Sequence, residues 1–333
     1  MQTELTKLTG IKYPIIMVPM FLVSNIAMMK AAMQAGILGM FPTLNFRISG
    51  ELENVIEVLQ EFKETHSITD GNFGVNLIAQ KTNPYFEEHL KICVERKVMS
   101  YITSLGNPEL VIEAAHAYGA KVFCDVVNMD HAEKVYKLGC DGFVAVGQGA
   151  GGHAGPYPLS ILVPSLRKNF PGKPVIAAGG IANGYSICSM LAMGAAGVSI
   201  GTRFIASHEA AVSNEYKNAV VESHMKDIVL TERISGTPCT IIDTPYAKRI
   251  GYRQNFFEKL LNNNATTKKY FKMLVQMRGL KRLEAAVKPG NYNNLWCAGQ
   301  SVELIDEIKP CHEIIDELVS ETRFAFDELQ EKF

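Results

Sequence analysis

Short apolar runs alternate with longer stretches of helical period between residue 11 and about residue 207. The runs that predict strands are PIIMVP, ILGMFP, FGVNLI, MSYIT, KVFCDVV, GFVAVG, PVIAAGG and GVSIGT. Such alternation is typical of βα units around a parallel sheet. Eight units in roughly 200 residues favour a closed (β/α)8 TIM barrel over an open sheet, which usually has five or six strands.

Glycines mark where several of the predicted helices end. Gly119, Gly139 and Gly194 each follow a helical stretch and precede a strand, the usual position of a C-terminal cap. After Ser207 the βα repeat stops and the sequence becomes mixed and polar. The final stretch, from Ser301 to Phe333, regains helical period and predicts two helices separated at Pro310.

Composition and charge narrow the class of protein. The chain has 333 residues, 47% hydrophobic and 20% charged, with a formal net charge of −1, as expected for a globular enzyme. This charge gives no reason to expect a nucleic acid or a membrane as partner. The seven cysteines form no C-x-x-C pair, which predicts that they hold no metal. The cysteine usage and the polar N-terminal segment predict a protein of the reducing cytoplasm.

One basic segment stands out locally. Lys259 to Lys288 holds eight Lys or Arg residues against one acid, Glu284. A solvated helix face explains this composition, and so does a surface that attracts an anionic substrate or carrier.

The candidate chemistry lies after the last three predicted strands. GQGAGGHAG, residues 147–155, follows the sixth strand and carries His153 among five glycines. Backbone without side chains lets a flat ring approach closely, with the imidazole facing the substrate. Gly179, Gly180, Gly201 and Thr202, after strands seven and eight, predict a phosphate site, because barrels commonly hold phosphate there. Tight βα turns would also explain these glycines.

Six motifs in order carry a family resemblance: IKYPIIMVPM, FGVNL, GQGAGGHAG, VIAAGGIANG, GVSIGTRFIAS and WCAGQS. The chain resembles the nitronate monooxygenase (2-nitropropane dioxygenase) family of FMN-dependent barrels. Flavin-dependent enoyl-ACP reductases share nearly the same motifs. The resemblance implies a barrel of residues 1–209 and 300–333, with an inserted smaller substrate or lid subdomain at 210–299.

The resemblance also implies a set of site residues. FMN would be its cofactor, with the FMN phosphate at Gly179, Gly180, Gly201 and Thr202. The remaining cofactor-binding residues it implies are Pro19, Met20, Asn76, Gly151, Gly152 and Gln300. His153 corresponds to the active-site histidine, and strand five carries Asp125 where some relatives carry a lysine.

The implied reaction is oxidation of an alkyl nitronate by FMN and dioxygen to a carbonyl compound and nitrite. His153 would orient and stabilise the anion, or act as a base on a neutral nitroalkane. One alternative is an NAD(P)H-dependent flavin reductase acting on enoyl-ACP or quinones. Another is a barrel that binds a phosphorylated metabolite without redox work. The sequence leaves open a homodimer and a role for NAD(P)H.

The other histidines are expected at surface or capping positions, since none has carboxylate partners at metal spacing. They are His66, His89, His116, His131, His208, His224 and His312.

Overall fold

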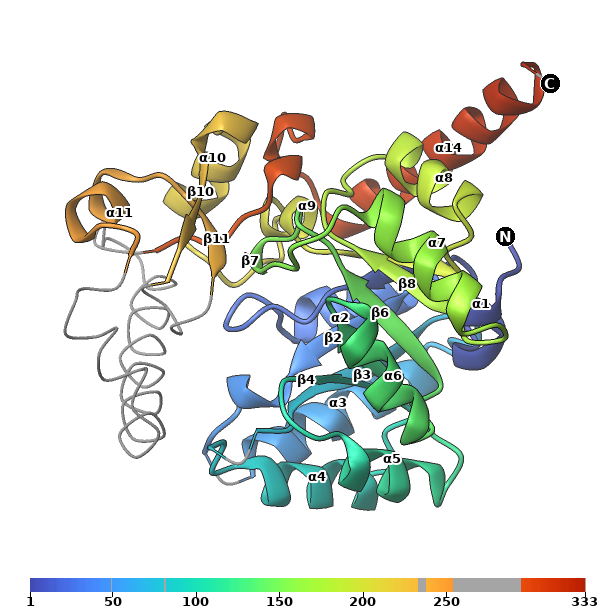
Figure 1. Ribbon diagram of the computed structural model, residues 1–333. Coiled ribbons are helices and arrows are strands. Elements are labelled where there is room, and N and C mark those ends of the chain that lie inside the picture. The colour runs from blue at the N-terminus through green and yellow to red at the C-terminus, as the bar shows by residue number, and fades with distance from the viewer. Residues whose placement is uncertain (49, 81, 233–237, 254–294, 333) are drawn as a thin grey trace.

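The chain forms a closed barrel of eight parallel strands, as the sequence predicts (Figure 1). The computed structural model describes residues 1–48, 50–80, 82–232, 238–253 and 295–332. In barrel order the strands are β1 (Ile15–Met17), β2 (Leu38–Pro42), β3 (Asn72–Ile78), β4 (Ser100–Ser104), β5 (Lys121–Val126), β6 (Gly142–Val146), β8 (Val175–Ala178) and β9 (Gly197–Ile200). β1 pairs with both β2 and β9, which closes the sheet.

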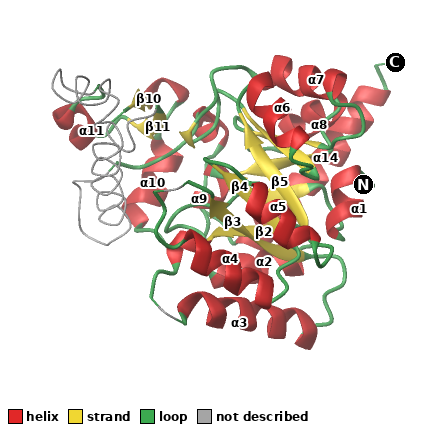
Figure 2. Ribbon diagram, turned by 60° about the horizontal axis from the view of Figure 1, so that its bottom comes forward, coloured by secondary structure: helices red, strands yellow, loops and turns green. Residues whose placement is uncertain are grey.

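Helices surround the barrel on its outside (Figure 2). Those between the strands are α2 (Ile26–Gln34), α3 (Glu51–Thr65), α4 (Phe86–Glu95), α5 (Glu109–His116), α6 (Met129–Lys137), α7 (Leu159–Asn169) and α8 (Gly184–Ala192); α1 (Glu4–Thr9) precedes β1, and the 3-10 helix η1 (Thr43–Asn45) follows β2. Gly119, Gly139 and Gly194 have φ of +86°, +86° and +93°. Their predicted place just beyond helix ends is confirmed.

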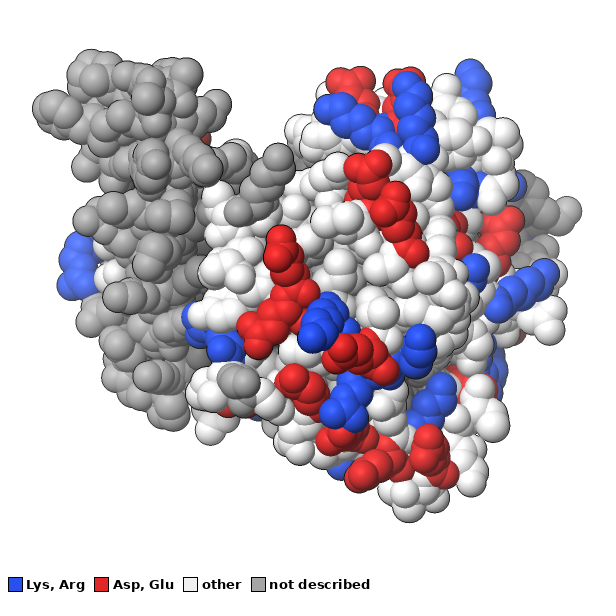
Figure 3. Space-filling view, turned by 90° about the horizontal axis from the view of Figure 1, so that it is seen from below, with Lys and Arg blue, Asp and Glu red and all other residues white. Residues whose placement is uncertain are grey.

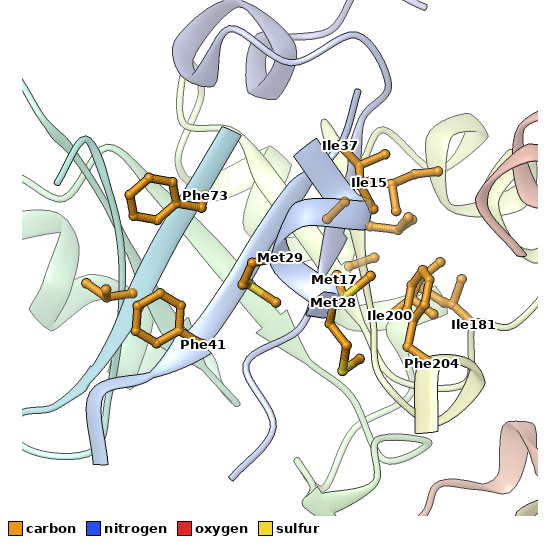
Figure 4. Packing of buried hydrophobic residues seen from close by; sticks show 14 of the residues in the cluster. Ile15, Met17, Met28, Met29, Ile37, Phe41, Phe73, Ile181, Ile200 and Phe204 are labelled. Carbon is orange, nitrogen blue, oxygen red and sulfur yellow. The ribbon is translucent and has the colours of Figure 1, made fainter. Parts of the chain in front are cut away.

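Two apolar layers hold the barrel together. The inner layer contains Ile16, Leu38, Ile102, Phe123 and Val144, each from a different strand. The outer layer packs the other strand faces against the helices. Figure 4 shows part of it, where Met28 and Met29 of α2 lie near Met17 of β1 and Phe41 of β2, and Phe204 lies near Ile200.

A second, three-stranded sheet lies beside the carboxyl end of the barrel (Figure 1). It consists of β10 (Ile228–Thr231), β11 (Cys239–Ile242) and β7 (Gly152–His153), all antiparallel. Its neighbours in the chain are α9 (Thr202–Ile205), α10 (Asn214–Glu222), η2 (Met225–Asp227) and α11 (Pro245–Ile250). The sequence predicts no strand at 152–153, so β7 is an addition to the expected fold.

The chain ends in one long helix, and the prediction of two closing helices is wrong. Residues 300–304 form only the short 3-10 helix η3 (Gln300–Leu304), and α14 (Cys311–Gln330) begins directly after Pro310. Proline fits before a helix because its fixed φ and missing N–H cost nothing there. α14 packs against α8 and α2.

The surface carries both signs of charge. Described acidic and basic side chains are interspersed on the face in Figure 3. The basic segment Lys259 to Lys288 lies within 254–294, outside the described residues. Within the described ranges, the helices are too short or too polar to cross a lipid bilayer.

Candidate active site at the barrel mouth

Glycines let three loops at the carboxyl ends of the strands touch one another. A Cβ added at Gly179 would lie 2.6 Å from the Ala150 nitrogen, and one at Gly149 would lie 3.1 Å from the Gly180 nitrogen. A Cβ at Gly151 would lie 2.8 Å from the Gly299 nitrogen. The loop after β6 is therefore packed against the loop after β8 and against residues 298–299, a role that the sequence analysis did not give to Gly149 and Gly151.

Two other glycines leave space at the same mouth. Gly180 is exposed, and a Cβ there would meet nothing closer than 3.9 Å; a Cβ at Gly152 would meet nothing within 4 Å. Thr202 is buried, and its Oγ1 accepts a hydrogen bond of 3.0 Å from the Gly299 nitrogen. Accepting that bond uses a lone pair of the hydroxyl and not its hydrogen. Accessible backbone and a hydroxyl donor fit the phosphate of a cofactor.

The first loop reaches the same region from β1. A Cβ at Gly201 would lie 2.7 Å from Val18 Cγ1 and 3.7 Å from Met20 Sδ, so the ends of β1 and β9 meet. Pro19 and Met20 are half-buried. Leu22 has a φ of +59°, unusual for a residue with a side chain, and its N–H donates to Asn45 Oδ1 at 2.9 Å. This bond holds the turn that follows Met20.

His153 belongs to β7, where it pairs with Cys239 of β11. Thr240 Oγ1 also donates to the Ala150 oxygen at 2.5 Å, so a side chain of β11 binds the loop after β6. His153 keeps an exposed face, while the surrounding atoms desolvate its ring and lower the pKa of His153 from its ordinary 6.5. At neutral pH the imidazole is therefore uncharged, and it can donate one hydrogen bond and accept another.

A chain of polar side chains crosses the ends of β3, β4 and β5. Asn76 Nδ2 donates to Ser104 Oγ at 2.7 Å, and Ser104 Oγ donates to Asp125 Oδ2. Burial raises the pKa of Asp125 to about 6, against the Ser104 hydrogen bond, which lowers it. The sequence analysis named Asn76 but missed Ser104 and gave Asp125 no role.

The structure thus assembles most of the predicted residues from two sides. Gly151, Gly179, Gly180, Gly201, Thr202 and Met20 meet through loop contacts, and Asn76 lies with Ser104 and Asp125. Gln300 is exposed at the start of η3, directly after the Gly299 contact.

One expectation for the other histidines is wrong. His89 is only 3% exposed, and its ring stacks on Tyr85 with 5.5 Å between centroids. It shares a face of α4 with Ile92 and Cys93, and that face turns toward the barrel. Burial lowers the pKa of His89. All seven cysteines are free thiols, and six of them are buried.

Comparison with known proteins points to one family. The model of the nitronate monooxygenase family matches residues 82–321. The "(3aS,4S,5R,7aS)-5-hydroxy-7a-methyl-1-oxo-octahydro-1H-indene-4-carboxyl-CoA dehydrogenase" of Rhodococcus jostii is 26% identical, over 99% of this chain and 98% of that protein. A probable nitronate monooxygenase of Staphylococcus saprophyticus is 28% identical, over 92% and 94%. FabK from Thermotoga maritima superposes with a TM-score of 0.84 at 30% identity, covering both chains completely.

Proposed function

Because the chain belongs to the nitronate monooxygenase family and is an oxidoreductase, we propose that it binds FMN at the barrel mouth and oxidises alkyl nitronates. Dioxygen would be the final oxidant, and a carbonyl compound and nitrite the products. The observation that carries this proposal is the placement of His153, whose backbone pairs with β11 beside the loops that would hold the cofactor and whose pKa is lowered by burial.

The proposed cofactor site combines both sides of the mouth. Gly179, Gly180, Gly201 and Thr202 would hold the phosphate, where the exposed backbone of Gly180 leaves room for an anion and Thr202 offers a hydroxyl. Pro19, Met20, Asn76, Gly151, Gly152 and Gln300 would lie along the rest of the flavin. When bound, FMN supplies the electron transfer between substrate and dioxygen.

His153 would act on the substrate. A neutral imidazole donates a hydrogen bond to an oxygen of the nitronate, which places and stabilises the anion. For a neutral nitroalkane, the unprotonated ring nitrogen would accept the proton from the carbon next to the nitro group. The lowered pKa keeps this lone pair available at neutral pH.

We also propose that residues 210–299 form a subdomain inserted into a barrel of 1–209 and 300–333, covering the substrate. Support comes from β11, which lies in this segment and pairs with β7 of the loop after β6. The described parts of the segment are 210–232, 238–253 and 295–299.

A second candidate is an NAD(P)H-dependent reaction on a thioester-bound substrate. It is favoured by the Rhodococcus relative, whose name specifies a carboxyl-CoA dehydrogenase and which matches this chain over nearly its whole length.

One anaerobic experiment separates the two candidates. The flavin absorbance of the purified protein is recorded before and after adding an alkyl nitronate, and in a second sample after adding NADH or NADPH. Bleaching by the nitronate alone, with recovery and nitrite release on admitting air, supports nitronate oxidation. Rapid bleaching by NAD(P)H alone would reject it in favour of the second candidate.

A further inference from the structure

Asn76, Ser104 and Asp125 all face the inside of the barrel. Side chains two residues apart on a strand share a face. Ile102 and Phe123 belong to the inner apolar layer, so Ser104 and Asp125 point inward one step closer to the carboxyl ends. Asn76 joins them through its bond to Ser104. The three residues therefore form a hydrogen-bonded polar group near the carboxyl end of the inner layer.

Among the residues that the structure describes, no cation compensates the charge of Asp125. On β4 the facing group is Ser104, on β6 the register partner is Val144, and β5 itself contributes Cys124. Burial and a hydrogen bond to Cys140 raise the pKa of Cys124, so its thiol stays neutral. His153, which follows β6, is uncharged at neutral pH. In the described part of the chain, only burial and the Ser104 bond shift the pKa of Asp125.

A carboxyl in this position is a switchable negative charge. Its pKa, raised to about 6 by burial, means that it becomes ionised near pH 6, and partial burial strengthens its action on other charges nearby. An ionised Asp125 repels any group at the mouth that gains negative charge, whereas a protonated Asp125 does not. Two-electron reduction of a flavin with uptake of one proton adds one negative charge, and protonation of Asp125 offsets that charge.

We propose that Asp125, positioned by Ser104 and Asn76, controls the reduction potential of the flavin by gaining or losing a proton at the barrel mouth. This inference rests on the FMN binding in the proposed function but not on the identity of the substrate. Ser104 is a positioning residue, since it acts through the carboxyl, and Asn76, which would lie along the flavin, holds Ser104 in place. The same charge disfavours binding of an anionic substrate above pH 6 and leaves a neutral one unaffected.

The test is the midpoint potential of the FMN-loaded protein from pH 4.5 to 8.5, measured by reduction with dithionite against reference dyes. Asp125→Asn removes the charge and keeps the shape. We expect its potential to match the wild type below pH 5 and to lie higher above pH 7. A tenfold change in the ratio of reduced to oxidised flavin corresponds to about 30 mV for two electrons.

Two further variants sharpen the result. Ser104→Ala removes the donor that lowers the Asp125 pKa, so the pH range in which the midpoint potential responds to Asp125 should move upward. This variant also tests the proposal if Asp125→Asn does not fold. Asp130→Asn, on the exposed surface of α6, is the matched control and should leave the potential unchanged.

The outcomes separate the two proposals. Parallel curves for the wild type and Asp125→Asn would overturn the role of Asp125. Diverging curves in a protein that does not oxidise nitronates would support this role and reject the proposed reaction. A protein that does not retain FMN would overturn both.

Discussion

The two sides of the barrel mouth are built by different means. After β6 and β8, glycines allow backbone to touch backbone, and after β9 Gly201 allows the backbone to approach the side chains of Val18 and Met20. After β3, β4 and β5, side chains form the site through hydrogen bonds from Asn76 to Ser104 to Asp125. The first side depends on shape, and at Gly149, Gly151 and Gly179 an added Cβ would lie too close to the neighbouring backbone. The second depends on protonation, so its properties change with pH while its shape stays the same.

The largest expected effect comes from the single imidazole on the glycine side. His153→Asn should lower kcat/KM for the nitronate by about 10² to 10⁴, the usual cost of removing an acid–base group, while the protein stays yellow. Steady-state nitrite release and the flavin spectrum measure the two properties. His131→Asn, on the exposed surface of α6, is the control. Full activity in His153→Asn would disprove its role.

Shape dependence on the glycine side can be tested with two alanines. Gly179→Ala forces a side chain onto a φ of +114° and against the Ala150 nitrogen. It should lower the free energy of unfolding by about 2 to 4 kcal/mol and also weaken FMN binding. Gly152→Ala has a φ of +72° but open space, and should cost only about 1 kcal/mol. Urea unfolding measures both, and equal losses would contradict the close packing of these loops.

On the polar side, the free energy of unfolding should depend on pH through Asp125. The folded-state pKa of Asp125, about 6, lies above the ordinary 3.8, so folding favours the protonated carboxyl. Its stabilising contribution is complete below pH 3.8 and disappears as the pH rises through 6, a loss of about 3 kcal/mol. Asp125→Asn should be spared that loss. Urea unfolding at pH 4 and pH 8 checks this, and an identical decline in both proteins would contradict it.

The sequence predicted the barrel because each of its strands is a buried apolar run bounded by turn residues. It did not predict β7, since Gly152 and His153 have no strand pattern and become a strand only by pairing with Cys239 and Thr240. The position of His89 was predictable: it lies three and four residues from Ile92 and Cys93, on their face of α4.

The site was predictable where chemistry lies in one segment and unpredictable where it is spread over strands. The glycines and His153 form short motifs. Asn76, Ser104 and Asp125 lie on three strands, and the register of the barrel brings them together. Each is a polar residue at the inward-facing carboxyl end of its strand, and a comparison of those positions across strands would have shown the group.

The pairing of β7 with β11 has a consequence for the order of folding. Ala150 and Thr240 are joined by a hydrogen bond across 90 residues of sequence, and contacts between distant residues form late because closing long loops costs entropy. On a ribosome, the barrel strands through β9 emerge before β11 does. A nascent chain therefore contains all eight barrel strands before the strand that pairs with His153 has been synthesised.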